Sequence, residues 1–338
     1  MKLRAATLLA VEFVIAAPAA EAGDIGHFNG GVMNLRDYLV PDPGIYGAVY
    51  NYFYRTDRLN GSHGDEIDSV RIDLPGGGAG VQVGVDVDVD MYALAPTLVG
   101  VTKLESLGIK LGALITPTFA DVGLDAALSA LDERGGSVSA GSFGVGDLFV
   151  QPVWLGLTLA HWDFALAYGF YAPIGRYDTE NVTVPGIGSV KAEAGDNLGY
   201  GFWTHQLQGS LAWYPMDNKG TALITAVTYE TNHEKRGFDV TPGDVLTLNW
   251  GASQFVPLKK DMSLLLEVGP GGYDTWQITD DSGNDATDIR DQVHAAGGQL
   301  GLTFVPWAVS LNLRGFGEFA SEARFQGWSL GLNLAKKF

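Results

Sequence analysis

The sequence of 338 residues contains no cysteine, few basic residues and no long apolar stretch beyond its first residues. Without cysteine there can be no disulfide framework, so an exported chain of this size must be held by its core, its sheet or a membrane. Only 21 basic residues accompany 39 acidic ones, giving a net charge of −18 that argues against binding to nucleic acid. No transmembrane helix is expected, because no apolar run of about 18 residues is found. These absences leave a soluble exported protein or a membrane β-barrel.

Residues 1–22 have the features of a secretory signal peptide. Two basic residues, at positions 2 and 4, precede an apolar stretch, and Ala20-Glu21-Ala22 offers a small-residue cleavage site. Glu12 interrupts the apolar stretch, and cleavage after Ala19 is an alternative. We expect this segment to be removed on export.

From Pro43 onward, apolar and polar residues alternate at period two, which predicts strands. In "WTHQLQGSLAWY" the apolar side chains share one face, while Thr204, Gln206 and Gln208 share the other. No segment has a convincing long helical pattern. About twelve strands are predicted, near residues 44–55, 85–100, 107–119, 147–159, 163–173, 199–214, 220–231, 244–256, 262–276, 292–305, 308–320 and 326–338.

Short and long connections alternate between these strands. Brief turns are predicted near residues 103–106, 160–162, 215–219, 257–261 and 306–307. Longer polar loops are predicted near residues 56–80, 121–146, 174–198, 232–243 and 277–291, with a shorter one near 321–325. An even strand number, with long loops on one side and short turns on the other, is typical of a bacterial outer-membrane barrel.

Aromatic residues cluster near the predicted strand ends, as expected of girdles at the two lipid interfaces. This set comprises Trp154, Trp162, Tyr171, Tyr200, Trp203, Trp213, Tyr214, Trp307 and Trp328. The alternative is a soluble sandwich with aromatics packed between its sheets, but a sandwich seldom needs strands this long.

The last strand, "QGWSLGLNLAKKF", favours the membrane. Its apolar residues lie on the parity of the terminal Phe338, and it resembles the C-terminal strand by which outer-membrane proteins are recognised by their assembly machinery. Lys336 departs from that pattern, although a lysine at the interface can extend its amine to water. Outer-membrane lipid and lipopolysaccharide are then expected partners.

Four motifs in order, "DYLVPDPGIYGAVYNYFYRTDRLNG", "GVGDLFVQPVWLG", "YGFYAPIGRYD" and "ITDDSG", together with the last strand, resemble the meta-pathway phenol-degradation family of outer-membrane channels. The resemblance implies an all-β, monomeric, antiparallel transmembrane barrel of about twelve strands, spanning residues 44–338. It also implies that residues 23–43 form a plug in the lumen, and that Tyr46, Tyr50, Tyr52 and Tyr54 form an inner ladder. The plug candidates are Phe28, Met33, Leu35, Tyr38 and Leu39. Members are associated with uptake of small hydrophobic or aromatic compounds and are not catalysts.

Sequence motifs for catalysis or metal binding are weak. "GWSLG" has the form of a nucleophile elbow around Ser329, but neither aspartate nor histidine follows it. The six histidines show no close ligand spacing. We therefore expect no enzyme activity and no cofactor or metal.

The stretch "GVDVDVDMYALAP" places Asp86, Asp88 and Asp90 on alternate positions. An EF-hand is excluded, because Met91 replaces the glycine and Thr97 the last carboxylate of that loop. The alternation predicts a strand with the carboxylates facing water and the valines facing lipid, since carboxylates in hydrocarbon would be costly. Lumen lining is the preferred interpretation, and an exposed rim above the membrane is the alternative.

The sequence thus predicts a passive outer-membrane channel for small, hydrophobic or aromatic molecules, selective through its width and lining. An acidic lining would also give a mild preference for cations. The pore-lining candidates are Asp86, Asp88, Asp90, Thr204, Gln206, Gln208, Asn312, Arg314 and Glu318. The alternatives are a lipid-modifying enzyme of the outer membrane, a structural or adhesion barrel, and a soluble sandwich.

Overall fold

The computed structural model describes residues 26–72, 81–130, 133–184, 188–194 and 197–338. The expected signal peptide, residues 1–22, lies outside these ranges. In the described chain, no helix has both the length and the apolarity needed to cross a membrane.

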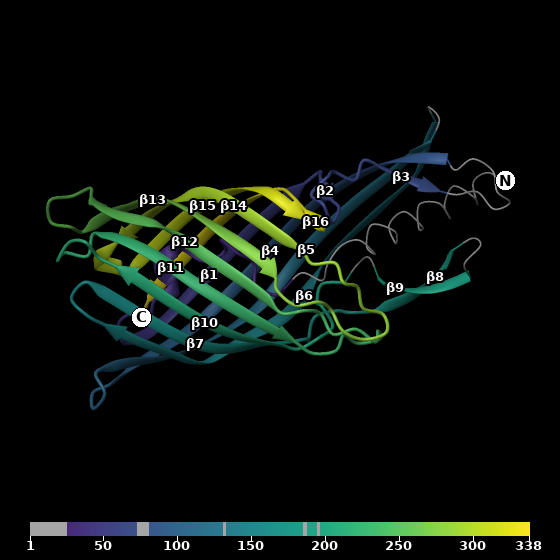
Figure 1. Cartoon of the computed structure of the whole chain (residues 1–338). Coiled ribbons are helices and arrows are strands. Elements are labelled where there is room, and N and C mark those ends of the chain that lie inside the picture. Colours follow the sequence, from purple (N-terminus) through teal and green to yellow (C-terminus); the bar gives the residue numbers. More distant parts are fainter. Residues whose placement is uncertain (1–25, 73–80, 131–132, 185–187, 195–196) are drawn as a thin grey trace.

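Twelve antiparallel strands close into a barrel (Figure 1). Each strand pairs with the next barrel strand in the sequence, and β1 pairs with both β17 and β4, which closes the ring. The barrel strands are β1 (Gly44–Thr56), β4 (Val81–Leu104), β5 (Ile109–Ala130), β6 (Glu133–Thr158), β7 (Trp162–Ala172), β10 (Thr204–Trp213), β11 (Thr221–Asn232), β12 (Val245–Pro257), β13 (Leu264–Gln277), β14 (Gln292–Phe304), β15 (Val309–Glu322) and β17 (Trp328–Lys337). Each corresponds to one predicted strand, so the prediction of an antiparallel barrel of about twelve strands is confirmed.

The connections carry the remaining elements. Small pairs form between β2 (Leu59–Asn60) and β16 (Arg324–Phe325) and between β8 (Thr179–Val184) and β9 (Gly188–Glu193), and β3 (Ser69–Ile72) pairs with β4. Two short 3-10 helices, η1 (Leu35–Tyr38) and η2 (Val305–Trp307), complete the structure.

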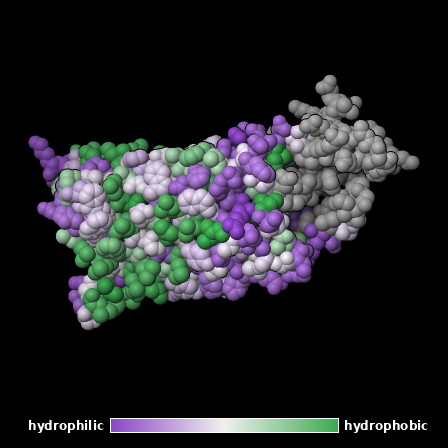
Figure 2. Space-filling view, in the orientation of Figure 1, coloured by the Kyte–Doolittle hydropathy of each residue, from purple (hydrophilic) through white to green (hydrophobic). Residues whose placement is uncertain are grey.

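The barrel is polar inside and apolar outside. Along β10, Thr204, Gln206 and Gln208 are buried, whereas Leu207 on the opposite parity is 50% exposed. Hydrophobic side chains form a broad band on the outer surface at the end that holds the C-terminus, and polar ones gather beyond it (Figure 2). A polar interior and an apolar exterior are the reverse of the pattern in a soluble protein, and they are expected of a barrel whose outer face meets lipid.

The expected aromatic girdle is partly correct. Five of the tryptophans lie on the outside and are substantially exposed: Trp162, Trp203, Trp213, Trp307 and Trp328. Trp154 and Tyr214 are buried instead, and Tyr171 lines the interior, because each occupies an inward-facing parity of its strand or turn.

Strands β4, β5 and β6 are much longer than the others, at 24, 22 and 26 residues. They run past the rest of the barrel at the end opposite the C-terminus (Figure 1). The prediction of a loop over residues 121–146 is therefore wrong, since β5 and β6 stay paired from Lys110↔Gly156 to Ala130↔Glu133. Their glycine-, serine- and alanine-rich ends lack the apolar alternation of a membrane strand because they extend beyond the apolar band.

Residues 26–43 are here called the N-terminal segment, and residues 26–40 of it lie inside the barrel. Leu35 and Leu39 pack on inward-facing residues of β10 and β11 and on Tyr214, and Phe28 and Tyr38 pack on Ala226. The wall makes room with glycine: a Cβ at Gly251 would lie 2.5 Å from the Leu35 side chain. The segment and the wall are therefore complementary in shape.

Outward-facing residues in the middle of the apolar band should not tolerate a charge. Val227, at the centre of β11, is 40% exposed. We expect Val227→Arg to lower the free energy of unfolding in lipid vesicles by about 2–4 kcal/mol, the cost of arginine near the bilayer midplane. Urea titration followed by tryptophan fluorescence measures this change.

The control is Leu107→Arg, in the turn between β4 and β5, where Leu107 is 66% exposed. At an interface the cost should stay below about 1 kcal/mol. Equal costs at the two positions would contradict lipid exposure of β11.

Candidate functional site

Inward-facing side chains of β11, β12 and β14 accept hydrogen bonds from the backbone of the N-terminal segment. Both Glu230 oxygens accept from the Phe28 amide, at 3.0 and 3.2 Å. The Gly31 amide donates to Asn249 Oδ1 at 2.9 Å, and the Leu35 amide donates to Gln299 Oε1 at 3.2 Å. An irregular segment has no ladder of its own, and buried amides without partners are costly, so these acceptors stabilise its position.

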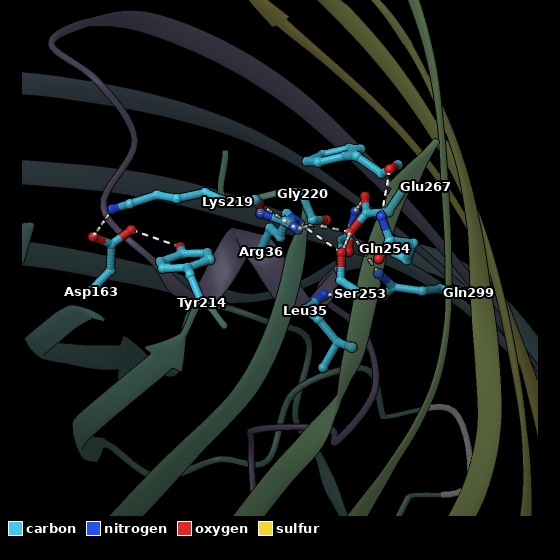
Figure 3. A network of polar contacts seen from close by, with 12 residues as sticks. Leu35, Arg36, Asp163, Tyr214, Lys219, Gly220, Ser253, Gln254, Glu267 and Gln299 are labelled. Atoms are coloured by element: carbon cyan, nitrogen blue, oxygen red, sulfur yellow. Dashed lines mark hydrogen bonds and ion pairs between the residues drawn. The ribbon is translucent and has the colours of Figure 1, made fainter. Parts of the chain in front are cut away.

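Arg36, on η1, is the main charged anchor (Figure 3). Its Nε donates to Ser253 Oγ at 2.8 Å and lies 3.3 Å from Glu267 Oε1, and its Nη2 donates to the Gly220 carbonyl at 3.0 Å. The guanidinium also stacks 4.2 Å from the centre of the Phe255 ring. Burial lowers the pKa of Arg36, and Glu267 opposes that shift. The anchor joins the segment to β12, β13 and the turn before β11.

Glu267 is buried and collects further donors. Gln299 Nε2 donates to its Oε1 at 2.9 Å, and Asn34 Nδ2 donates to its Oε2 at 3.2 Å (Figure 3). A buried carboxylate needs a cation and several donors to offset its desolvation, and Glu267 has both. Beside this network, Lys219 Nζ lies 3.1 Å from Asp163 Oδ1, and the Tyr214 hydroxyl donates to Asp163 Oδ2 at 2.7 Å.

His27 anchors the other end of the segment. Its Nε2 lies 3.0 Å from Asp147 Oδ2, and its Nδ1 lies 2.8 Å from Thr204 Oγ1. Rings of Tyr171, Tyr200 and Phe202 surround the imidazole at centroid distances of 4.7, 4.5 and 5.0 Å. Burial lowers the pKa of His27, and Asp147 opposes that shift.

Asp147 also holds the long connection between β7 and β10. The Gly175 amide donates to its Oδ1 and the Tyr200 amide to its Oδ2, each at 2.9 Å. One carboxylate on β6 thus binds both the N-terminal segment and an outer loop. The packing is tight here, because a Cβ at Gly199 would lie 2.6 Å from Asp147 Oδ1.

Thr204, His27 and Asp147 are hydrogen-bonded one to the next, as the nucleophile, base and acid of a catalytic triad are. A hydrolytic nucleophile must reach its substrate. Thr204 is fully buried, and its hydroxyl donates to Asn232 Oδ1 at 2.6 Å. The three residues therefore form an anchor. Ser329, the serine of the nucleophile-elbow pattern, is buried on β17 and hydrogen-bonds Tyr52.

A cavity of about 360 Å³ remains between the N-terminal segment and the wall, mainly at β1, β4 to β7 and β10, with Ser310 of β15 and Ala335 of β17 also in its lining. Most of these strands lie away from the acceptors of β11 to β14, although β10 neighbours β11 and β15 neighbours β14. The lining is mainly aromatic and apolar, and includes Phe28, Met33, Tyr46, Tyr50, Tyr52, Leu114, Phe149, Trp154 and Tyr171, with Asp37, Gln151, Gln206 and Gln208 among its polar members. The expected tyrosine ladder of β1 is thus part of the cavity wall, except Tyr54, which donates to Glu318 Oε2 at 2.8 Å.

Six of the pore-lining candidates face the interior. Gln206 and Gln208 line the cavity, and Thr204 binds His27. Asn312 and Arg314 are buried on β15, and Glu318 accepts from the Tyr54 and Tyr273 hydroxyls at 2.8 Å.

The expectation that the aspartate run faces the lumen is wrong for Asp90. Its side chain lies on the outer face of the barrel, and strand alternation places Asp88 on the same outer face. Asp90 lies opposite Arg55 on β1, 3.6 Å from its Nε, with a side chain 63% exposed. The cavity-lining residues of β4 are odd-numbered, from Ala93 to Val99, so the even positions face outward. The side chain of Asp86 lies outside the described residues. The position of Asp88 and Asp90 resembles the alternative interpretation, an exposed rim above the membrane. A preference of the channel for cations can no longer be based on these aspartates.

All five plug candidates contact the inner wall or the cavity. Phe28, Leu35, Tyr38 and Leu39 are buried, and Met33 is partly buried against the cluster of Phe28 and Tyr38.

The anchors themselves were not predicted from the sequence. They are His27, Arg36, Asp147, Glu230, Asn249, Ser253, Glu267 and Gln299. A signal was present for two of them, since Glu230 and Glu267 are carboxylates within membrane strands, where an ionisable residue indicates a functional position by default.

A family model shows the protein family to which the chain belongs. The family model described as "Putative MetA-pathway of phenol degradation" matches residues 56–334. The chain belongs to this family. The resemblance read from the sequence motifs is confirmed, and the comparison with curated protein sequences gives no match.

The structure aligns with solved structures of outer-membrane barrels. An outer membrane channel from Pseudomonas putida F1 aligns with a TM-score of 0.62 and 16% identity, covering 90% of this chain and 100% of that one. The β domain of the Bordetella autotransporter BrkA aligns at 0.43 and 13%, covering 87% and 100%. The toluene transporter TodX of Pseudomonas putida aligns at 0.41 and 10%, covering 94% and 96%. The first likeness establishes the fold, and family and fold together place the protein in the bacterial outer membrane.

In the described part of the chain, no three histidine, aspartate or glutamate side chains lie close enough together to hold a metal ion.

Removal of the Arg36 charge should release the middle of the N-terminal segment. Arg36→Met leaves Glu267 buried without its cation, and breaking such a pair costs about 3–5 kcal/mol. We expect hydrogen exchange of the amides of residues 31–36 to accelerate by about a hundredfold. The control is Arg290→Met, which removes a half-exposed pair with Asp280 in a loop and should leave this exchange unchanged. Unchanged exchange in Arg36→Met would show that the anchor does not hold the segment.

Substitution of Asp147 should loosen two parts of the chain at once. Asp147→Asn removes the charge that His27, Gly175 and Tyr200 share, and hydrogen bonds to a charged group are worth about 1.5–3 kcal/mol each. Exchange should therefore rise together at residues 26–30 and at the Gly175 and Tyr200 amides. Asp163→Asn, at the opposite end of the barrel, is the matched control and should affect neither. A rise in only one of the two regions would contradict their coupling.

Proposed function

We propose that the protein is an outer-membrane channel through which small hydrophobic or aromatic molecules enter passively. The observation that carries this proposal is the cavity of about 360 Å³, lined by aromatic side chains, inside a barrel with a lipid-facing outer surface. Its volume lies within the range of small-molecule sites, and a mainly apolar lining with few polar groups is typical of them. Family membership and the shared fold of the Pseudomonas putida F1 channel are consistent with this function.

The residues of the cavity favour a passive role. Selectivity would come from its width and its lining, as in other channels. The nucleophile-like Thr204 is closed off by its neighbours, so a lipid-modifying enzyme receives no support from this geometry. A structural or adhesion barrel would not need an aromatic cavity within its membrane-embedded part.

The N-terminal segment would act as the plug of this channel, beginning near Gly23 in the mature chain. It is hydrogen-bonded to β11, β12 and β14 and forms one wall of the cavity. Passage of a molecule larger than the cavity would then require the segment to leave its anchors. Opening would be controlled by the contacts of Arg36 and His27.

The outer surface would contact two further partners. The polar outer face of β4 to β6, with Asp88 and Asp90, would lie among lipopolysaccharide headgroups beyond the apolar band. The C-terminal strand β17, whose Leu330, Leu332 and Leu334 face outward, would be read by the outer-membrane assembly machinery. The protein would function as a monomer, because its barrel closes within one chain.

Uptake of a labelled aromatic compound tests the proposal. Cells that lack the chromosomal gene are supplied with wild-type protein, with a variant lacking residues 26–40, or with a variant whose residues 26–40 are replaced by an equally long glycine and serine sequence. Wild type should restore uptake at limiting concentration, and both variants should be at least as fast. In planar bilayers the two variants should conduct several times more than wild type, because no anchored segment then occupies the interior of the barrel.

Two results would contradict these roles. Uptake by wild-type cells no faster than by cells without the gene would remove the channel function. Equal conductance of wild type and both variants would remove the plug.

A further inference from the structure

One carboxylate faces the cavity. Among the described residues that line it, Asp37 is the acidic one. Arg36 and His27 are the lining residues that can carry a positive charge. Arg36 and His27 both use their nitrogens to bind the barrel wall. Asp37 lies at the end of η1 and is partly exposed, so its carboxylate is available to a molecule in the cavity.

The Asp37 carboxylate has few donors. The Tyr50 hydroxyl donates to its Oδ2 at 3.1 Å, and the backbone of Asn34 supplies a second hydrogen bond. A carboxylate offers about four acceptor positions, so at least one remains. In the described chain no cation lies within ion-pair distance of it, although Arg314 on β15 acts on it electrostatically, as does Glu267 with the opposite sign.

The protonation state of Asp37 keeps it an acceptor at neutral pH. Burial raises the pKa of Asp37 to about 6, with Arg314 and the Tyr50 hydroxyl opposing the shift. At pH 7.5 the group is therefore mainly ionised. A donor brought by a ligand would find an anion that lacks its full set of partners.

The rest of the wall suits an aromatic ring. Tyr46, Tyr50 and Tyr52 on β1 and Phe149 and Trp154 on β6 all line the cavity. An apolar cavity of about 150 Å³ holds benzene, so 360 Å³ admits a ring with substituents.

We propose that Asp37 is a specificity-determining residue, which makes the cavity prefer aromatic molecules bearing a hydrogen-bond donor on the ring over hydrocarbons of the same shape. The donor is a hydroxyl or an amino group, and it binds the free acceptor position of the carboxylate. This inference rests on the proposed function, because it assigns a ligand chemistry to the same cavity.

Three molecules of equal shape test the inference: p-cresol, p-toluidine and p-xylene, which differ in carrying a hydroxyl, an amino or a methyl group. Their binding to the full-length protein in lipid nanodiscs is measured by equilibrium dialysis with labelled compounds at pH 7.5, with empty nanodiscs as background. Wild type should bind p-cresol and p-toluidine about tenfold more tightly than p-xylene, as one hydrogen bond to a charged acceptor would give. Asp37→Leu should lose this preference and keep its affinity for p-xylene.

Further variants separate Asp37 from its surroundings. Asp37→Asn keeps the shape and a neutral acceptor, so a preference of about threefold should remain even if the leucine variant folds poorly. Tyr50→Phe frees a second acceptor position on Asp37 and should maintain or increase the preference. Asp261→Leu removes an exposed carboxylate in the turn between β12 and β13 and serves as the control, with wild-type binding of all three compounds.

The outcomes distinguish this inference from the proposed function. Equal binding of the three compounds by wild type would overturn the role of Asp37 and leave the cavity as a site for aromatic molecules. A preference that survives in Asp37→Leu but disappears in Tyr50→Phe would move the role to Tyr50 and overturn the proposal. Failure of wild type to bind any of the three would overturn both the proposed function and the inference.

Discussion

Hydrogen bonding of the backbone inside the membrane is the constraint on which the rest of the structure depends. Lipid offers neither donors nor acceptors, so the sheet has to close, and β1 pairs with β17 on one side and β4 on the other. The same requirement extends to any irregular chain inside the barrel. The N-terminal segment forms no ladder of its own, and the wall supplies acceptors to its amides at Phe28, Gly31 and Leu35. Buried carboxylates and amides on β11 to β14 are explained by this need.

The interior is consequently divided into two unlike halves. Where the wall offers acceptors and small residues, the segment packs closely against it, as Leu35 does beside Gly251. Where the wall is lined by rings, the backbone of the segment has fewer partners, such as Lys110 Nζ, which donates to the Val40 carbonyl at 3.2 Å, and a cavity remains. The chemistry of the wall, rather than the diameter of the barrel, decides where the space lies.

Much of the fold could be predicted from the sequence, because alternation and turn residues are local signals. All twelve barrel strands and the short turns follow from them. The aspartate run shows the limit of this reasoning. Its period is correct, but alternation alone does not say which parity meets lipid. Further along β4, Tyr92 and Leu98 share the parity of Asp90, and Leu98 is 55% exposed, so the register of the whole strand sets the face.

The candidate site was less accessible to sequence reasoning. The polar residues of β10 could be placed inside from their parity, and the tyrosines of β1 from the family resemblance. The anchors could not, because Phe28 and Glu230 are 202 positions apart and nothing local marks their pairing. Only the rarity of a carboxylate in a membrane strand pointed to Glu230 and Glu267.

The covalent link between the N-terminal segment and β1 has a consequence for how the barrel can open. The segment is an intramolecular ligand, and once released its eighteen or so residues would reach no further than roughly 60 Å. Its anchors on the wall would therefore experience it at a millimolar effective concentration at all times. Rebinding would be fast and independent of how many copies of the protein are in the membrane, and an added peptide of the same sequence would have to reach millimolar concentration to compete. Each barrel would thus open and close independently of its neighbours. The rate at which the contacts of Arg36 and His27 dissociate would set how long it stays closed.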